Sequence, residues 1–266
     1  MSRIQTVFAQ LRANHKKALI PYITAGDPHP KHTVDLLHQL VKSGADMIEL
    51  GIPFSDPMAD GPVIQRASER ALVHKVGLKN VLDMVAEFRL TDQITPIILM
   101  GYANPIEAMG VENFTQTAKA AGVDGVLTVD YPPEESTEFI AALKANHIDS
   151  IFLLSPTSDD IRIDLIVSQA TGFLYYVSLK GVTGAANLDI DEVSARVAVI
   201  RAKTDLPIGV GFGVKDAATA KKVATFADAI VVGSRMVQTI EQSNAENLMA
   251  NVSQLMQELR QAIDSN

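Results

Sequence analysis

Short apolar runs alternate with amphipathic stretches along the whole chain. The runs have the length of buried strands, and the stretches between them carry apolar residues at helical spacing. We predict eight strands from this pattern, at residues 18–24, 47–51, 97–101, 125–129, 150–154, 174–178, 208–212 and 229–233. Helices are predicted between the strands, two of them at 62–73 and 78–89.

Several predicted helices place their apolar residues on one face. A possible capping box of Ser2 and Gln5 precedes an N-terminal helix. The apolar stripes are Ile4, Val7, Phe8 and Leu11; Leu36, Leu37, Leu40 and Val41; Ile161, Leu165 and Ile166; and Val252, Leu255, Met256, Leu259 and Ile263. Each such stripe predicts a helix packed against a common core.

Similar turns join helices to strands at residues 44–46, 122–124, 147–149 and 226–228. Recurrent joints of this kind indicate βα units and a parallel sheet. Eight units favour an α/β fold of the (β/α)8 TIM-barrel type, with an extra N-terminal helix and an elaborated loop after strand two. A doubly wound open sheet is the alternative, but no G-x-G-x-x-G follows the first strand. We expect a single domain over residues 1–266, because no linker or composition break interrupts the pattern.

Composition narrows the possible partners. The 266 residues are 47% hydrophobic and carry a net charge of −8, which argues against nucleic acid or an anionic membrane as partner. An anionic small ligand stays possible. The absence of cysteine excludes disulfides, thiolate zinc sites and a thiol nucleophile, and it fits a cytoplasmic protein. No apolar run is long enough for a membrane span or for the core of a signal peptide.

A carboxylate interrupts the second predicted strand. Alternation places Ile48 and Leu50 on one face and Glu49 on the other, which in a barrel is the interior. Burial there would raise the pKa of Glu49, as suits a group that gives and takes a proton. The alternatives are a solvent-facing glutamate or one paired with a lysine or arginine.

A second carboxylate, Asp60, follows on a loop rich in proline and glycine. Loops after barrel strands lie on the catalytic face, so Glu49 and Asp60 suggest an acid/base pair at a pocket. The alternative for Asp60 is a helix N-cap or turn residue.

Glycine loops end the last three predicted strands, at residues 181–184, 211–213 and 233–234. Their backbone N–H groups, with the positive end of a helix dipole, can hold a phosphate, although ordinary tight turns look the same. Arg235 is a possible further positive charge. The apolar or aromatic residues in or at the ends of strands are candidate pocket walls or simple core: Tyr22, Met100, Leu127, Leu153, Tyr175 and Phe212. No histidine cluster has the spacing of a metal site.

Residues 48–61, which read IELGIPFSDPMADG, closely resemble the signature of the tryptophan synthase alpha subunit family. The resemblance covers nearly the whole chain. It extends to PYITAGDP at 21–28, MGYANP at 100–105, DYPPEE at 130–135, and the segments 175–184 and 209–213. It implies a (β/α)8 barrel that cleaves indole-3-glycerol phosphate to indole and glyceraldehyde 3-phosphate by a retro-aldol reaction, in tryptophan biosynthesis.

The family also implies a role for each candidate residue. Glu49 would be the general acid/base, and Asp60 would accept the indole N–H. Tyr22, Met100, Leu127, Tyr175, Thr183 and Phe212 would contact the substrate, with Thr183 on a mobile loop. Gly184, Gly213, Gly233 and Ser234 would bind its phosphate.

The resemblance further implies an α2β2 complex with a beta subunit that carries pyridoxal phosphate, with no cofactor in this chain. Residues 53–56, 104–105 and 130–132 are the candidate partner surface. Three other functions stay open: a non-catalytic regulatory subunit, another barrel enzyme for a phosphate-bearing ligand, and a free-standing indole producer.

Overall fold

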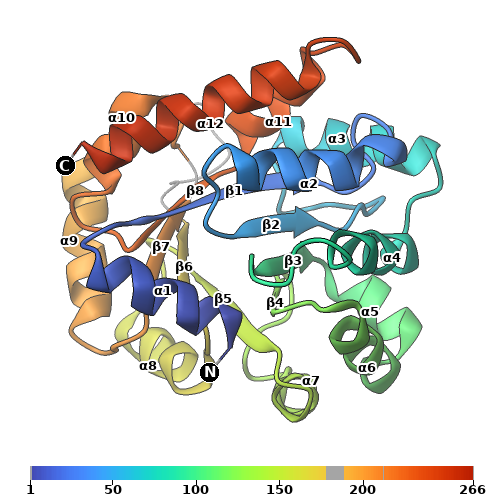
Figure 1. Ribbon diagram of the computed structural model, residues 1–266. Helices are drawn as coiled ribbons and strands as arrows, with labels where there is room; N and C mark the ends of the chain where they lie inside the picture. The colour runs from blue at the N-terminus through green and yellow to red at the C-terminus, as the bar shows by residue number, and fades with distance from the viewer. Residues whose placement is uncertain (1, 178–188, 212, 266) are drawn as a thin grey trace.

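A closed parallel barrel organises the described part of the chain. The computed structural model describes residues 2–177, 189–211 and 213–265. Within these residues eight strands pair in sequence order, and the last strand pairs with the first (Figure 1). They are β1 (Ala18–Thr24), β2 (Ile48–Gly51), β3 (Ile97–Gly101), β4 (Gly125–Thr128), β5 (Asp149–Leu154), β6 (Leu174–Val177), β7 (Ile208–Gly211) and β8 (Ala229–Val232). The TIM-barrel prediction is confirmed and the open sheet is wrong.

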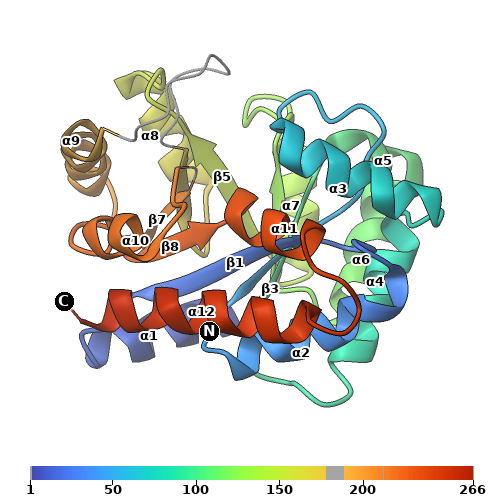
Figure 2. The same ribbon diagram turned by 90° about the horizontal axis from the view of Figure 1, so that it is seen from above.

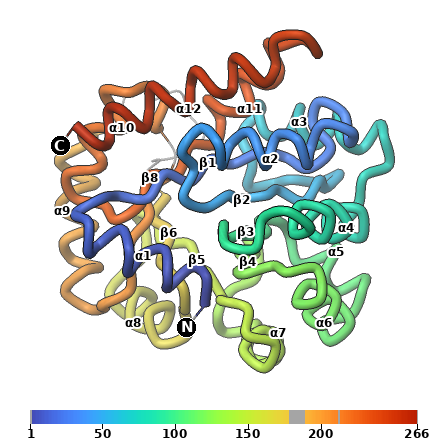
Figure 3. Tube along the Cα trace, viewed as in Figure 1, coloured from blue at the N-terminus to red at the C-terminus, as the bar shows by residue number. Residues whose placement is uncertain are grey.

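Helices surround the strands, and the chain winds once around the barrel in sequence order (Figure 3). They are α1 (Arg3–Ala13), the 3-10 helix η1 (Pro30–His32), α2 (Thr33–Lys42), α3 (Pro62–Val73), α4 (Leu78–Phe88), α5 (Ala103–Met109), α6 (Val111–Ala121), α7 (Thr137–Ala145), α8 (Asp160–Gln169), α9 (Ile190–Arg201), α10 (Ala217–Val223), α11 (Ser234–Glu241) and α12 (Leu248–Asp264). The capping box of Ser2 and Gln5 is present at the start of α1. Ile4 and Phe8 of α1 pack against the barrel interior, so the extra N-terminal helix closes the bottom of the barrel.

Strand boundaries agree with the sequence pattern to within one residue, except that residues 178 and 212 lie outside the described residues. One helical stripe is wrong. Ile161 is 81% exposed, and α8 instead buries Ile163 and Ile166. Ile161 precedes Ile163 by two positions, which is about 200° around a helix, so it faces solvent when Ile163 faces the core.

Two apolar layers follow from the alternation of each strand. Ile48 and Leu50 of β2 belong to the layer between strands and helices, and Met47 belongs to the barrel interior. Glu49 therefore points inward, as predicted.

The connection from β2 to β3 is the elaborated one, since it holds both α3 and α4. Helix α3 packs beside α11, and both pack against β1 (Figure 2). This arrangement brings the segment after β2 next to the segment after β8, although the two are far apart in sequence. Both helices begin at the carboxyl end of the barrel.

Candidate active site

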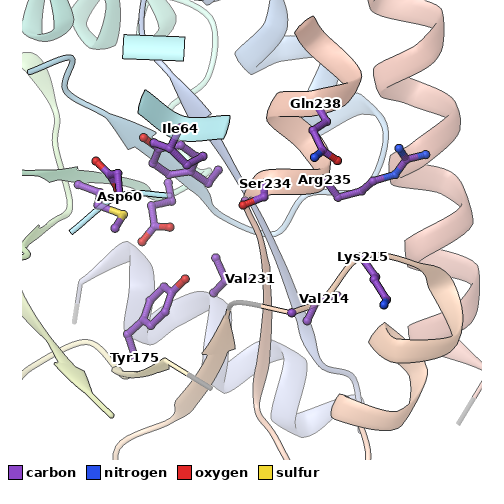
Figure 4. Close-up of a pocket in the computed structure, with 14 residues that line it drawn as sticks. Asp60, Ile64, Tyr175, Val214, Lys215, Val231, Ser234, Arg235 and Gln238 are labelled. Atoms are coloured by element: carbon purple, nitrogen blue, oxygen red, sulfur yellow. The ribbon is translucent and has the colours of Figure 1, made fainter. Parts of the chain in front are cut away.

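A cavity of about 270 Å³ opens at the carboxyl ends of the strands (Figure 4). Barrel enzymes place their chemistry at this end. The side chains and glycines that line it are Tyr22, Glu49, Asp60, Ile64, Met100, Tyr175, Gly213, Val214, Lys215, Val231, Gly233, Ser234, Arg235 and Gln238. Figure 4 shows Asp60 and Tyr175 on one side of the cavity and Ser234 and Arg235 on the other. The cavity thus has an acidic end and an end formed by a helix start.

Glu49 is a buried acid that faces the cavity. Glu49 is 1% exposed, and its Oε1 atom has no hydrogen-bond partner among the described residues. Burial, together with the nearby charge of Asp60, raises the pKa of Glu49 to about 8. The solvent-facing alternative is wrong, and no ion pair to Glu49 is present in the described part of the chain. Glu49 is consequently mostly protonated at neutral pH and can donate a proton to a ligand.

Asp60 is held by a tyrosine from the next strand along the barrel. Tyr102, which follows β3 and is 4% exposed, donates a hydrogen bond from Oη to Asp60 Oδ2 at 3.0 Å. The backbone N–H of Ala59 donates to the same Oη at 3.0 Å, which fixes the ring against the loop. Burial raises the pKa of Asp60, and the Tyr102 hydrogen bond opposes this effect. The N-cap of α3 is Gly61, so Asp60 does not cap that helix, but its backbone N–H donates to Pro57 O at 3.0 Å, so it is the turn residue that the other alternative predicted.

Sequence reasoning missed the role of Tyr102. The signal was its position directly after a predicted strand that neighbours β2, where a side chain can reach the loop carrying Asp60. The contact joins residues 42 positions apart, which strand alternation alone does not predict.

Two tyrosines of the cavity wall lie over glycines of neighbouring strands. A Cβ atom at Gly51 would lie 2.1 Å from Tyr22 Oη, and one at Gly211 would lie 2.0 Å from Tyr175 Oη. Tyr22 Oη also shares a hydrogen bond of 3.3 Å with Thr24 Oγ1. Only glycine at the ends of β2 and β7 leaves room for these phenol groups.

Replacing Gly51 by alanine is expected to lower kcat/KM for the reaction at this site about 100-fold. The added methyl group overlaps Tyr22, so the ring must shift within the cavity, and a misplacement of about 1 Å can cost this much. Steady-state kinetics with circular dichroism would measure the effect. Gly77→Ala is the matched control, because its methyl group would have no neighbour within 4 Å. Equal kcat/KM in Gly51→Ala and Gly77→Ala would contradict the prediction.

The opposite end of the cavity is built from backbone N–H groups. Helix α11 begins at Ser234 behind the N-cap Gly233, which supplies no side-chain acceptor. The first-turn N–H groups of a helix have no intrahelical partner, and the helix dipole is positive there. Gly213, with φ of 83°, lies on the same wall. Lys215 and Arg235 add positive charge, so this end suits a phosphate.

The structure brings together most of the residues predicted for the site. Tyr22, Met100 and Tyr175 line the cavity with the two acids, and the predicted phosphate residues Gly213, Gly233 and Ser234 lie at its other end. Leu127 is fully buried in the barrel interior and is not among the lining residues. The other predicted contacts lie outside the described residues, and they are Thr183, Gly184 and Phe212.

Five lining residues were not predicted: Ile64, Val214, Lys215, Val231 and Gln238. Lys215 follows the glycine loop after β7, and Gln238 lies one turn after Ser234 in α11, so proximity to the predicted phosphate loops could have indicated both.

The described residues offer neither a metal site nor a membrane-spanning helix. No group of three or more His, Asp or Glu side chains within these residues could hold a metal ion. Among the helices of the described segments, every one is too short or too polar to cross a membrane.

The sequence profile of the family described as "Tryptophan synthase alpha chain" matches residues 8–264. The tryptophan synthase alpha chain of Nitrosomonas europaea is 59% identical over 265 residues, covering 100% of this chain and 96% of that protein.

Solved structures agree with this match. The crystal structure of tryptophan synthase subunit alpha from Legionella pneumophila str. Paris superposes with a TM-score of 0.93 at 48% identity, covering 100% of both chains. A chain of tryptophan synthase from M. tuberculosis, in its aminoacrylate-bound form, gives a TM-score of 0.89 at 33% identity and covers 99% of this chain and 100% of that one.

Proposed function

The chain belongs to the tryptophan synthase alpha chain family, and from this premise we propose that Glu49 and Asp60 carry its reaction. It is a carbon–carbon lyase of tryptophan biosynthesis, which cleaves indole-3-glycerol phosphate into indole and glyceraldehyde 3-phosphate. One observation supports the residue assignment above all: a buried acid with an unpartnered oxygen among the described residues shares a cavity with an uncapped helix start.

Glu49 acts first as an acid and then as a base. Its proton goes to C3 of the indole ring, which makes that carbon tetrahedral and places positive charge on the ring nitrogen. The Glu49 carboxylate then takes the proton of the hydroxyl on the carbon attached to C3. The carbonyl of glyceraldehyde 3-phosphate forms, the bond to C3 breaks, and its electron pair restores the aromatic ring of indole. Glu49 ends protonated, as it began.

Asp60 stabilises the charge that develops on the ring nitrogen. A fixed carboxylate accepting the indole N–H lowers the energy of the cationic intermediate, because Tyr102 holds it in place before the charge appears. Tyr22, Met100 and Tyr175 supply the wall against which the flat ring packs. The phosphate lies at Ser234, so the two ends of the cavity hold the two ends of one substrate.

The partner is a tryptophan synthase beta subunit, in an α2β2 complex. Three segments support a common docking surface: residues 53–56, 104–105 and 130–132 follow β2, β3 and β4 at the same end of neighbouring strands. Met58, two residues after the first of these segments, is 79% exposed. Pyridoxal phosphate belongs to the beta subunit, this chain needs no cofactor of its own, and the complex works in the cytoplasm.

The assignment is tested by following indole release from indole-3-glycerol phosphate with the purified chain, alone and with a beta subunit. We expect turnover that the beta subunit increases. A purely regulatory subunit would show no turnover in either sample, and a barrel enzyme for another phosphate-bearing ligand would bind sugar phosphates in preference to the indole compound. Sedimentation with the beta chain separates the α2β2 complex from a free-standing indole producer.

The pH dependence of kcat/KM follows from the pKa of Glu49. Because burial raises this pKa to about 8, the free enzyme holds the required proton below pH 8 and loses it above. We expect kcat/KM to fall by about tenfold per unit above about pH 8, and to fall also in acid as the Asp60 carboxylate, whose pKa is raised by burial, becomes protonated. Asp60→Asn removes the charge that helps to raise the Glu49 pKa, so the break should move to lower pH. A break that stays in place would argue against Glu49 as the titrating group.

A further inference from the structure

An ion network lies behind the cavity and joins three elements of the fold. Arg70, in the last turn of α3, donates from Nε and Nη2 to the two carboxylate oxygens of Asp27 at 2.6 and 2.9 Å. Asp27 follows β1 and is fully buried. The Nη1 atom of Arg70 donates to Glu241 Oε1 at 2.7 Å, and Glu241 is the last residue of α11. Arg66, one turn earlier in α3, also pairs with Glu241 through two bonds of 2.8 Å.

The same three elements carry parts of the active site, and the two helices carry them at the ends opposite to the network. Strand β1 contributes Tyr22, α3 begins two residues after Asp60, and α11 begins at Ser234. Between the cavity and the network, a small apolar cluster packs the elements together, and its buried members are Tyr22, Ile64, Ala67 and Val237. Helices α3 and α11 are therefore held together both near the cavity and at their far ends.

Local physical chemistry does not favour these charges where they lie. An acid at the C-terminal end of a helix, as Glu241 is, faces the negative end of the dipole. A fully buried carboxylate such as Asp27 loses its hydration. Arg70 offsets only part of the cost at Asp27, because burial still raises the pKa of that carboxyl above its ordinary value. Arg66 and Arg70 together hold the pKa of Glu241 down at about 2. Apolar residues of similar volume often stabilise a fold as well as a buried ion pair does. The clearer effect of this network is therefore that it fixes the positions of β1, α3 and α11 relative to one another.

We propose that the network of Asp27, Arg70 and Glu241 sets the distance between the indole end and the phosphate end of the site, and that Arg70 is a positioning residue. This inference rests on the proposed function, since it needs one substrate that touches both ends. The end at Asp60 moves with α3, and the end at Ser234 moves with α11. Arg70, in α3, bonds to Asp27 after β1 and to Glu241 in α11, so it ties α3 to both of these elements. A substrate that spans the cavity gains affinity from the correct spacing, whereas a fragment that touches one end does not.

The test compares one spanning ligand with two fragments. The fragments are indole and glycerol 3-phosphate, and the spanning ligand is the non-cleavable analogue in which a propyl chain joins indole to phosphate. The double variant Asp27→Asn/Arg70→Gln removes both charges of the buried pair together, so neither charge is left alone. We expect its dissociation constants for the two fragments to stay within twofold of the parent values. Its affinity for the spanning analogue should fall about tenfold and its kcat/KM about 100-fold, as for a reacting group misplaced by about 1 Å.

A matched control exists at the opposite end of the barrel. Arg260 of α12 donates to Asp46, before β2, at 2.9 Å, and both side chains are largely buried. The variant Asp46→Asn/Arg260→Gln makes the same chemical change there, and should leave the three dissociation constants and kcat/KM near the parent values, whatever its effect on Tm. Glu241→Gln, which keeps the shape of a half-exposed acid, gives a second variant should the Asp27/Arg70 double variant not fold.

The outcomes separate the two claims. Equal weakening of fragments and analogue, or no weakening of the analogue, in the folded network variants would overturn the positioning role. Failure of the parent protein to bind the analogue would instead overturn the proposed function, because the cavity would then not hold an indole ring and a phosphate of one ligand together. A change of Tm alone, shared with the Asp46/Arg260 control, would show that the network only stabilises the fold.

Discussion

Glu49→Gln is expected to lower kcat/KM for indole release by about 1,000-fold or more. Glutamine has nearly the same shape but can neither give a proton to C3 nor take one from the hydroxyl, and this acid/base step contributes about 100- to 10,000-fold. The phosphate end does not include Glu49, so affinity for glycerol 3-phosphate should be unchanged. Single-turnover assays at high enzyme concentration would measure the residual rate. Turnover within tenfold of the parent would contradict the mechanism.

The stability of the same variant supplies the control against misfolding. The pKa of Glu49 is about 8 in the folded state, above its ordinary value of 4.5, so folding favours the protonated form. Stability from this residue is complete below about pH 4.5 and is lost as the pH rises to about 8. Glutamine avoids this loss, so Glu49→Gln should be more stable than the parent by about 3 kcal/mol at pH 7, and by little at pH 4.5. Urea unfolding at both pH values would show an inactive but more stable protein.

The fold could be predicted from the sequence because the apolar residues within each short run already indicate a buried strand. In β2, Ile48 and Leu50 face the helices while Glu49 faces the interior, and period two is visible without any knowledge of the neighbours. Helix phase is less secure when the apolar residues are few. Ile161 and Ile163 are both apolar, and only the packing of α8 against the barrel decides which one is buried.

Site residues could be predicted where the residue type is unusual for its position in the local pattern. Glu49 is an acid within an apolar strand, and the ends of the later strands are rich in glycine, so both features are visible in the sequence alone. Alternation gives the side that a residue faces but not its depth, and so Leu127, which pairs in register with Met100, lies in the core while Met100 lines the cavity. The Arg70 contacts join residues 43 and 171 positions apart, and no local pattern encodes such pairs.

Asp60→Asn is expected to lower kcat about 100- to 1,000-fold, with little change in Tm. Protonation of C3 interrupts the aromatic ring and places positive charge on its nitrogen, and a preorganised group aimed at developing charge contributes this much. Asparagine keeps a hydrogen-bond acceptor but loses the charge. Gly61, not Asp60, caps α3, so the helix start should be unaffected and circular dichroism should not change.

Tyr102→Phe separates the charge of Asp60 from its placement. This variant keeps the carboxylate but removes the phenol hydroxyl that donates to it at 3.0 Å, so the carboxylate can move. We expect a fall of about tenfold in kcat, because a loosely held charge stabilises the cation less than a fixed one does. Pre-steady-state rates of indole formation would measure both variants, and we expect the parent to be fastest, Tyr102→Phe to be slower, and Asp60→Asn to be slowest. If Asp60→Asn were the faster variant, the charge would be dispensable, and the cation would have to be stabilised by another group of the cavity.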